Sequence, residues 1–183
     1  MIICITGMPG SGKSVAANYL ARKGFEVIEM GDIIRDKMKK EGIRITNESI
    51  REYALSLRKR FGNDIVAKLT VQKINGKRKN MVIVGVRSKK EIDYFRKRLG
   101  NFYVIALTAP KMVRYKRLKE RGRQDDVVTM KEFKYREEKE RKYGVESAIK
   151  NADFVIANTS SINDLKKDID SALALLKRSR KQS

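Results

Sequence analysis

The chain has 183 residues, of which 41% are hydrophobic and 36% charged, and this length suits one domain with a sizeable core. Forty-three lysines and arginines against 22 aspartates and glutamates give a net charge of +21, which favours polyanionic partners such as nucleotides or RNA. No apolar run approaches the roughly 18 residues that span a bilayer, no signal peptide is recognisable, and the single cysteine, Cys4, cannot form an internal disulfide. We therefore expect a cytoplasmic protein without a membrane partner.

The most informative stretch, residues 7–14, fits the phosphate-binding pattern G-x-x-x-x-G-K-[ST] at every fixed position. It reads Gly7, Met8, Pro9, Gly10, Ser11, Gly12, Lys13 and Ser14. The glycines allow backbone N–H groups to point at an anion, and the following helix presents its N-terminal dipole to the same phosphates. Lys13 can reach the β- and γ-phosphate oxygens, and the Ser14 hydroxyl can ligate Mg²⁺. The stretch predicts a site for ATP and Mg²⁺, with GTP as the alternative nucleotide.

Short apolar runs alternate with helical patterns along the chain, which predicts a parallel sheet with right-handed crossovers. The predicted strands cover residues 2–6, 25–29, 81–84, 102–107 and 153–157. The predicted helices cover residues 13–22, 31–40, 48–61, 65–74, a helix from 88, 110–120, 129–142, and a closing helix before a frayed basic tail at 177–183. Capping boxes are predicted at Ser88–Glu91 and Thr129–Glu132.

The fold class that follows is α/β, a three-layer P-loop NTPase fold with a five-stranded parallel sheet. We expect a single domain over residues 1–183. Two consecutive helices form an insertion at about 31–76 beside the acceptor pocket.

Two glycine-and-arginine groups follow strands of this predicted sheet, where ligands of open parallel sheets bind. The second strand leads to Gly31 and Arg35, and the third leads to Gly85 and Arg87. Both arginines suit one phosphate of an acceptor, because a guanidinium binds phosphate with fork geometry. The alternative is that both are surface charges in a very basic chain.

A further arginine cluster lies on the helix after the fourth strand. Arg114, Arg117 and Arg121 recur at i, i+3 and i+7, and Arg123 follows a glycine. Such arginines can neutralise a transferring phosphoryl group and exclude water from it. A solvated charged face is the alternative interpretation.

Taken together, these motifs resemble those of the nucleoside monophosphate kinases, adenylate kinase especially. The phosphate loop and the segment from Ala152 to Asn158 also resemble dephospho-CoA kinases, and the whole chain is most similar to an archaeal group of adenylate-kinase-related proteins. The resemblance implies that the single domain over residues 1–183 is kinase-like and that a short helical lid covers about 115–143. It also implies that Arg35 and Arg87 hold the acceptor phosphate, that Arg117, Arg121 and Arg136 are lid arginines, and that the turn after Asn158 lies near the adenine.

One position departs from the adenylate kinase pattern. Those kinases carry an acidic residue just before the third-strand glycine, where it orders the waters of Mg²⁺, whereas this chain has Val84. Asp32 is the expected substitute, since it lies near the phosphate loop and matches the aspartate that receives a hydroxyl proton in dephospho-CoA kinases. The alternative for Asp32 is a helix cap.

The leading functional hypothesis is a phosphotransferase that moves the γ-phosphate of ATP to a nucleoside monophosphate-like acceptor. The alternative is a nucleotide-binding module or slow ATPase, associated with RNA, which Val84 and the +21 charge both motivate although no nucleic-acid motif accompanies the charge. A third, weaker hypothesis is phosphorylation of a hydroxyl, as in dephospho-CoA kinases. The sequence does not define the oligomeric state.

Overall fold

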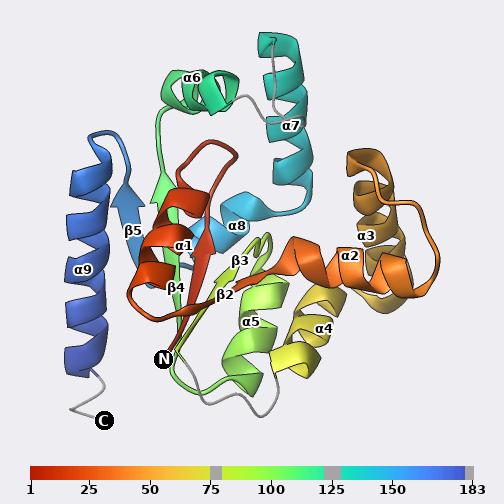
Figure 1. Cartoon of the computed structure of the whole chain (residues 1–183), viewed down its shortest axis with the longest axis horizontal. Helices are drawn as coiled ribbons and strands as arrows, with labels where there is room; N and C mark the ends of the chain where they lie inside the picture. The colour runs from red at the N-terminus through yellow and green to blue at the C-terminus, as the bar shows by residue number, and fades with distance from the viewer. Residues whose placement is uncertain (75–79, 122–128, 180–183) are drawn as a thin grey trace.

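In the computed structural model, residues 1–74, 80–121 and 129–179 are described, and they form one five-stranded parallel sheet flanked by helices (Figure 1). The strands are β1 (Ile2–Thr6), β2 (Glu26–Glu29), β3 (Met81–Val84), β4 (Phe102–Thr108) and β5 (Phe154–Ala157). They lie in the order β2-β3-β1-β4-β5, and every neighbouring pair is parallel. The predicted α/β class and five-stranded parallel sheet are confirmed.

Every helix predicted from the sequence is present. The helices are α1 (Lys13–Arg22), α2 (Met30–Lys40), α3 (Asn47–Phe61), α4 (Ile65–Ile74), α5 (Lys89–Arg98), α6 (Lys111–Arg121), α7 (Met130–Lys142), α8 (Val145–Lys150) and α9 (Ile162–Ser179). The six-residue α8 was not predicted, because so short a helix shows no periodicity. Helix α9 also continues through Ser179, two residues beyond the expected start of the frayed tail at Lys177. Among the described helices, none is both long and apolar enough to cross a bilayer.

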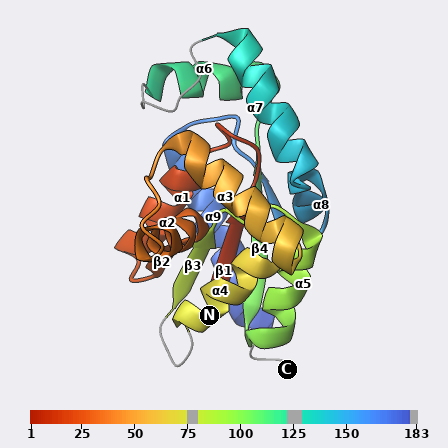
Figure 2. The same ribbon diagram turned by 90° about the vertical axis from the view of Figure 1, so that its right-hand side faces the viewer.

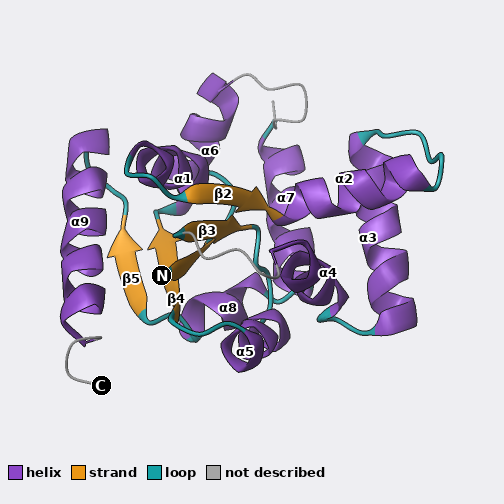
Figure 3. Cartoon of the chain, turned by 60° about the horizontal axis from the view of Figure 1, so that its bottom comes forward, coloured by secondary structure: helices purple, strands orange, loops and turns teal. Residues whose placement is uncertain are grey.

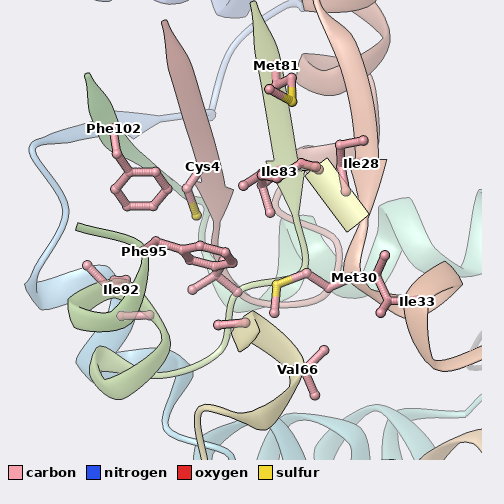
Figure 4. Packing of buried hydrophobic residues seen from close by; sticks show 14 of the residues in the cluster. Cys4, Ile28, Met30, Ile33, Val66, Met81, Ile83, Ile92, Phe95 and Phe102 are labelled. Carbon is pink, nitrogen blue, oxygen red and sulfur yellow. The ribbon is translucent and has the colours of Figure 1, made fainter. Parts of the chain in front are cut away.

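Alternate strand residues face two separate hydrophobic layers, so the sheet is buried on both faces. Ile3, Ile5 and Val84 pack with α1 and α9. On the opposite face, Cys4 and Ile83 pack with residues of α2, α4 and α5, and Phe95 of α5 forms a tilted ring pair with Phe102 of β4 (Figures 3 and 4). This double burial explains why the strands read as continuous apolar runs in the sequence.

The strand order creates a binding crevice at the carboxyl end of β1. The chain crosses from β1 to one side through β2 and β3, and it reaches β4 and β5 on the other side, which makes β1 the switch point of the sheet. Helices α6 and α7 lie over this carboxyl edge, and α2 and α3 lie beside it (Figures 1 and 2). The fold therefore brings the phosphate loop, helices α6 and α7, and helices α2 and α3 to one end of the sheet (Figure 1).

The two predicted capping boxes have different outcomes. At α7 the box is confirmed, since the Thr129 side chain accepts from the Glu132 N–H and the Glu132 side chain accepts in return from the Thr129 N–H. At α5 only half of it forms: Ser88 accepts from the Glu91 N–H, but the Glu91 carboxylate accepts instead from the Arg87 N–H at 2.8 Å.

Glu91 is fully buried, and its carboxylate has a second hydrogen-bond partner besides the Arg87 N–H. These two contacts explain why it does not complete the capping box. Arg58 of α3 reaches the other carboxylate oxygen at 3.3 Å. The buried carboxylate therefore joins α3, α5 and the loop after β3, and a charge so far from water requires such partners.

We expect the substitution Glu91→Gln to destabilise the fold, because the largely covered Arg58 guanidinium loses its counter-charge and the Arg87 N–H loses an anionic acceptor. The free energy of unfolding, measured by urea denaturation, should fall by about 3 kcal/mol. The matched control is Glu52→Gln on the exposed face of α3, which should change it by less than about 0.5 kcal/mol. Equal stability of the two variants would contradict the structural role of Glu91.

Candidate functional site

The phosphate loop approaches two other segments so closely that its glycines cannot be replaced. Gly10 and Gly12 have φ angles of +80° and +103°, in the left-handed region that side chains disfavour. A Cβ atom on Gly10 would lie 2.5 Å from the carbonyl oxygen of Arg114, and one on Gly12 would lie 2.3 Å from Nδ2 of Asn158. The loop is thus packed between α6 and the turn that follows β5.

Lys13 lies along the inside of this loop. Its Nζ donates hydrogen bonds to the carbonyl oxygens of Gly7 at 2.7 Å and Met8 at 3.1 Å. Removal from water lowers the pKa of Lys13 to about 8, and the carboxylate of Glu140 offsets part of this effect. The charged form lacks a full counter-charge, which the phosphates of a nucleotide would supply.

A cavity of about 460 Å³, here called the phosphate-loop cavity, opens beside the loop. Six of the eight predicted loop residues line it: Gly7, Pro9, Gly10, Gly12, Lys13 and Ser14. The other two do not line it. Met8 presents its carbonyl to Lys13, and the buried Ser11 hydroxyl has no hydrogen-bond partner among the described residues.

Asn158 shapes the far end of this cavity. Its side-chain Nδ2 donates to the Ser11 carbonyl at 2.9 Å, and its own carbonyl accepts from Nη1 of Arg117 at 3.0 Å. Ser160 and Ile162 continue the wall from the turn after β5. The structure therefore brings Asn158 to the loop, while the position of the adenine remains a prediction.

The predicted lid arginines divide into two groups. Arg117 and Arg121 of α6 and Arg136 of α7 line the phosphate-loop cavity, whereas Arg123 lies outside the described residues. Arg114, expected to share their exposed face, does not line the cavity.

Arg114 is instead buried, because its position on α6 faces the loop and α7 rather than the open cavity. Its guanidinium donates to the carbonyl of Pro9 at 3.3 Å and forms an ion pair with the buried Glu137 of α7. Burial opposes ionisation of Glu137, but Arg114 outweighs it and holds the pKa of this carboxyl below its usual value. Arg114 thereby ties the phosphate loop to both lid helices.

A second cavity of about 430 Å³, here called the arginine cavity, adjoins the first. It collects all five residues predicted for acceptor binding: Gly31, Arg35, Gly85, Arg87 and Arg136. Arg51 and Arg58 of α3 also line it, and the sequence analysis missed both because they lie within an ordinary amphipathic helix. Its apolar lining comes from Met30, Ile34, Ile50, Ala54 and Val66.

The expected position of Asp32 is wrong. Its side chain is 55% exposed, pairs with Arg35, and is not among the residues that line either cavity. The reason is helical geometry: α2 begins at Met30, and burial of Met30, Ile33 and Ile34 turns position 32 outward. Asp32 is thus not placed for chemistry at the phosphate loop.

Two carboxylates that the sequence analysis missed line the phosphate-loop cavity instead, and Glu29 is the first. It is the last residue of β2 and pairs in register with Val84, the position where the acidic residue was expected on β3. The carboxylate is thus supplied by the neighbouring strand, a register that cannot be read from sequence alone.

Glu29 and the Ser14 hydroxyl are hard oxygen donors on the same cavity, and they fit Mg²⁺, which prefers oxygen ligands and retains several waters. Among the described residues, no group of three or more His, Cys, Asp or Glu could enclose a metal by itself. A Mg²⁺ ion here would depend on phosphate oxygens and water, as it does in other phosphoryl-transfer sites.

Glu140 of α7 is the second missed carboxylate, and it lies where the two cavities meet. Gly85, Arg87, Arg136 and Glu140 line both cavities and are here called the shared wall. Oε2 of Glu140 accepts from Nε of Arg87 at 2.8 Å. Burial acts to raise the pKa of Glu140, but Arg87 and Lys13 outweigh it and keep the pKa below its usual value.

The sequence did contain a signal for Glu140. One face of α7 carries four residues spaced at i, i+3, i+4 and i+7. In that order they are Phe133, Arg136, Glu137 and Glu140, of which Phe133 and Glu137 are buried and Arg136 and Glu140 line the cavity. Charged residues on the inner face of a lid helix are the pattern to look for.

We expect ATP binding to take up protons near pH 8. The pKa of Lys13 is lowered to about 8 in the free protein, and phosphate charges would raise it again, so ATP should draw in about half a proton at pH 8. Titration calorimetry in two buffers of different ionisation enthalpy measures this uptake. The proton uptake should vanish at pH 6, where Lys13 is already charged. It should also vanish in any residual ATP binding by Lys13→Ala. No proton uptake by the wild type at pH 8 would contradict the assignment of Lys13 to the phosphates.

Comparison with known proteins shows the family of the chain. Residues 3–143 match the AAA domain family. A UPF0200 protein of Pyrococcus horikoshii is 41% identical over 95% of this chain and 96% of its own length, and one from Sulfurisphaera tokodaii is 40% identical over 94% and 95%.

Solved structures show the same fold at lower identity. A gluconokinase from Sinorhizobium meliloti 1021 has a TM-score of 0.61 and 16% identity, covering 99% of this chain and 96% of its own. A shikimate kinase from Aquifex aeolicus has a TM-score of 0.56 and 18% identity, covering 95% and 96%. These likenesses show a P-loop kinase-like fold, while the resemblance to adenylate and dephospho-CoA kinases remains a prediction. The chain belongs to the UPF0200 protein family and to the AAA domain family.

Proposed function

We propose that the protein is an ATP-dependent phosphotransferase that acts on a small phosphate-bearing acceptor of nucleotide type. The observation that carries this proposal is the pair of adjoining cavities, because one is built on the phosphate loop and the other on arginines. A simple nucleotide-binding module needs only the first. A second pocket that meets the first at a charged wall is what transfer between two bound substrates requires.

On the donor side, the phosphate loop binds the triphosphate of ATP, and Lys13 neutralises its β- and γ-phosphates. Ser14 would hold Mg²⁺ and Glu29 would order its waters, and the metal would offset the charge of the phosphates. Arg117, Arg121 and Arg136 stabilise charge on the transferring group, and Arg123 is assigned the same role from its sequence position. The turn from Asn158 to Ile162 receives the adenine.

On the acceptor side, the lining of the arginine cavity matches a nucleotide-type molecule. Arg35, Arg51 and Arg58 provide donors for a phosphate group. Apolar residues of α2 and α3 and the rings of Tyr135 and Tyr143 offer contacts for a flat or apolar moiety. The neighbouring fold of shikimate kinase and gluconokinase supports phosphotransfer as a class without naming the acceptor.

A nucleotide-binding module with slow ATPase activity, associated with RNA, is the second candidate. The net charge of +21 favours it, because RNA binding depends on neutralising many phosphates. The arginine cavity weighs against it, since a module of this kind has no need for a second small-molecule pocket beside the first.

The test is transfer of label from γ-labelled ATP, with Mg²⁺, to AMP, the other nucleoside monophosphates, dephospho-CoA, or no acceptor. We expect label on one acceptor. Lys13→Ala should reduce transfer by about 10²-fold or more, since the cation at the transferring phosphate is lost. Arg22→Ala at the exposed end of α1 is the matched control and should retain activity.

Two results would contradict the phosphotransferase. Release of label as free phosphate alone, or no release despite tight ATP binding, would favour the second candidate. Retention of the protein on RNA that weakens steeply with salt would then identify the module.

A further inference from the structure

The shared wall also bears on which group of the acceptor receives the phosphoryl group. Two kinds of oxygen can attack the γ-phosphorus: the oxygen of an acceptor phosphate, which is already anionic, and the oxygen of a hydroxyl, which is neutral and must lose a proton. These two nucleophiles place opposite demands on the protein at the point where the cavities meet. A phosphate nucleophile needs cations and no base, whereas a hydroxyl needs an acceptor for its proton.

The shared wall carries a carboxylate at this point. Glu140 lines both cavities, and among the described residues it is the sole carboxylate that does so. Glu29 lines the phosphate-loop cavity alone, and Asp32 lines neither. A carboxylate in this position repels an incoming phosphate oxygen but accepts a hydrogen bond from an incoming hydroxyl.

The position of Glu140 is fixed from two directions. Arg87 holds its Oε2 at 2.8 Å from the loop after β3. Three residues earlier on α7, Glu137 pairs with Arg114, whose guanidinium also reaches the Pro9 carbonyl of the phosphate loop. The carboxylate is therefore held in a defined place relative to the loop that binds the donor, as a residue that touches the reacting atoms must be.

The arginines of the arginine cavity differ in which cavities they line. Arg87 pairs with Glu140, and Arg35 and Arg58 are likewise paired, with Asp32 and Glu91, so an acceptor phosphate would join or displace a carboxylate at each of them. Arg35, Arg51 and Arg58 line the arginine cavity without lining the phosphate-loop cavity. A phosphate bound by that outer set leaves the rest of the acceptor free to present a hydroxyl at the shared wall.

We propose that the phosphoryl group is transferred to a hydroxyl of the phosphate-bearing acceptor, and that Glu140 is the catalytic base that receives the hydroxyl proton; this rests on the phosphotransferase function proposed above. In the step, a bond forms between the hydroxyl oxygen and the γ-phosphorus of ATP. The bond from the γ-phosphorus to the β,γ-bridging oxygen breaks, and its electron pair leaves with ADP. The hydroxyl proton passes to Glu140 Oε1, while Arg87 keeps Oε2. The product is a phosphate monoester rather than a phosphoanhydride.

The experiment uses the full chain with γ-labelled ATP, Mg²⁺ and, in separate reactions, AMP, GMP, CMP, UMP and dephospho-CoA. Labelled product is heated briefly in dilute acid, which releases label from a phosphoanhydride but not from a phosphate monoester. We expect acid-stable label on one acceptor. Acid-labile label on a nucleoside monophosphate would overturn the inference and leave the proposed phosphotransferase standing, whereas no transfer to any acceptor would overturn both.

The variants test the role of Glu140 itself. Glu140→Gln keeps the side-chain volume and an oxygen for Arg87 but cannot take the proton, so kcat should fall by about 10²–10⁴-fold with unchanged KM for both substrates. Glu140→Asp should recover part of the loss. The matched control is Glu138→Gln on the exposed side of α7, which should behave as wild type. Full kcat in Glu140→Gln, or a rise in acceptor KM alone, would show that Glu140 only positions Arg87.

Discussion

The close packing of the phosphate loop against the α6 backbone and the Asn158 side chain is the constraint on which the site depends. Gly10 and Gly12 leave room for α6 on one side and for the turn after β5 on the other, at separations that no Cβ atom would permit. Arg114 and Asn158 then complete the packing with hydrogen bonds to the carbonyls of Pro9 and Ser11. A nucleotide at this loop would touch the lid and the C-terminal part of the chain at once.

At this end of the sheet, ion pairs lie beside the phosphate loop despite the large excess of positive charge in the chain. The chain carries a net charge of +21, yet two arginines beside the loop are accompanied by carboxylates: Arg114 by Glu137, and Arg87 by Glu140. The buried Arg114 guanidinium needs such a partner, because unpaired charge in a weakly polar interior is costly. Lys13 differs, since its ammonium is held by carbonyl oxygens and its pKa is lowered. This contrast marks Lys13 as the group that gains most from an arriving phosphate.

Much of the fold could be read from the sequence because its signals are local. The phosphate loop follows a spacing set by phosphate geometry, and strands buried on both faces read as continuous apolar runs. Helix α8 was not predicted because six residues cannot show a helical period. Glu91 does not complete the predicted capping box because its carboxylate binds Arg58 instead. Local rules fail where tertiary contacts offer a side chain a better partner.

The site was only partly predictable, for a related reason. Arg35 and Arg87 follow strand ends, and the topology of a parallel sheet brings strand ends together whatever lies between them in the chain. Glu29 and Glu140 depend on the register of β2 against β3 and on which face of α7 turns inward, and neither follows from the spacing of one segment. The position of Asp32 was predicted wrongly because burial of Met30, Ile33 and Ile34 sets the inward face of α2 and turns position 32 toward solvent.

A crystal structure of the protein with Mg²⁺ and a non-hydrolysable ATP analogue would examine this arrangement most directly. We predict that the triphosphate lies in the phosphate loop, with Lys13 on its β- and γ-phosphates and the γ-phosphate facing Arg136 and Glu140 at the shared wall. A nucleotide bound outside the loop, or a γ-phosphate directed away from the arginine cavity, would contradict the assignment of the two cavities as donor and acceptor sites.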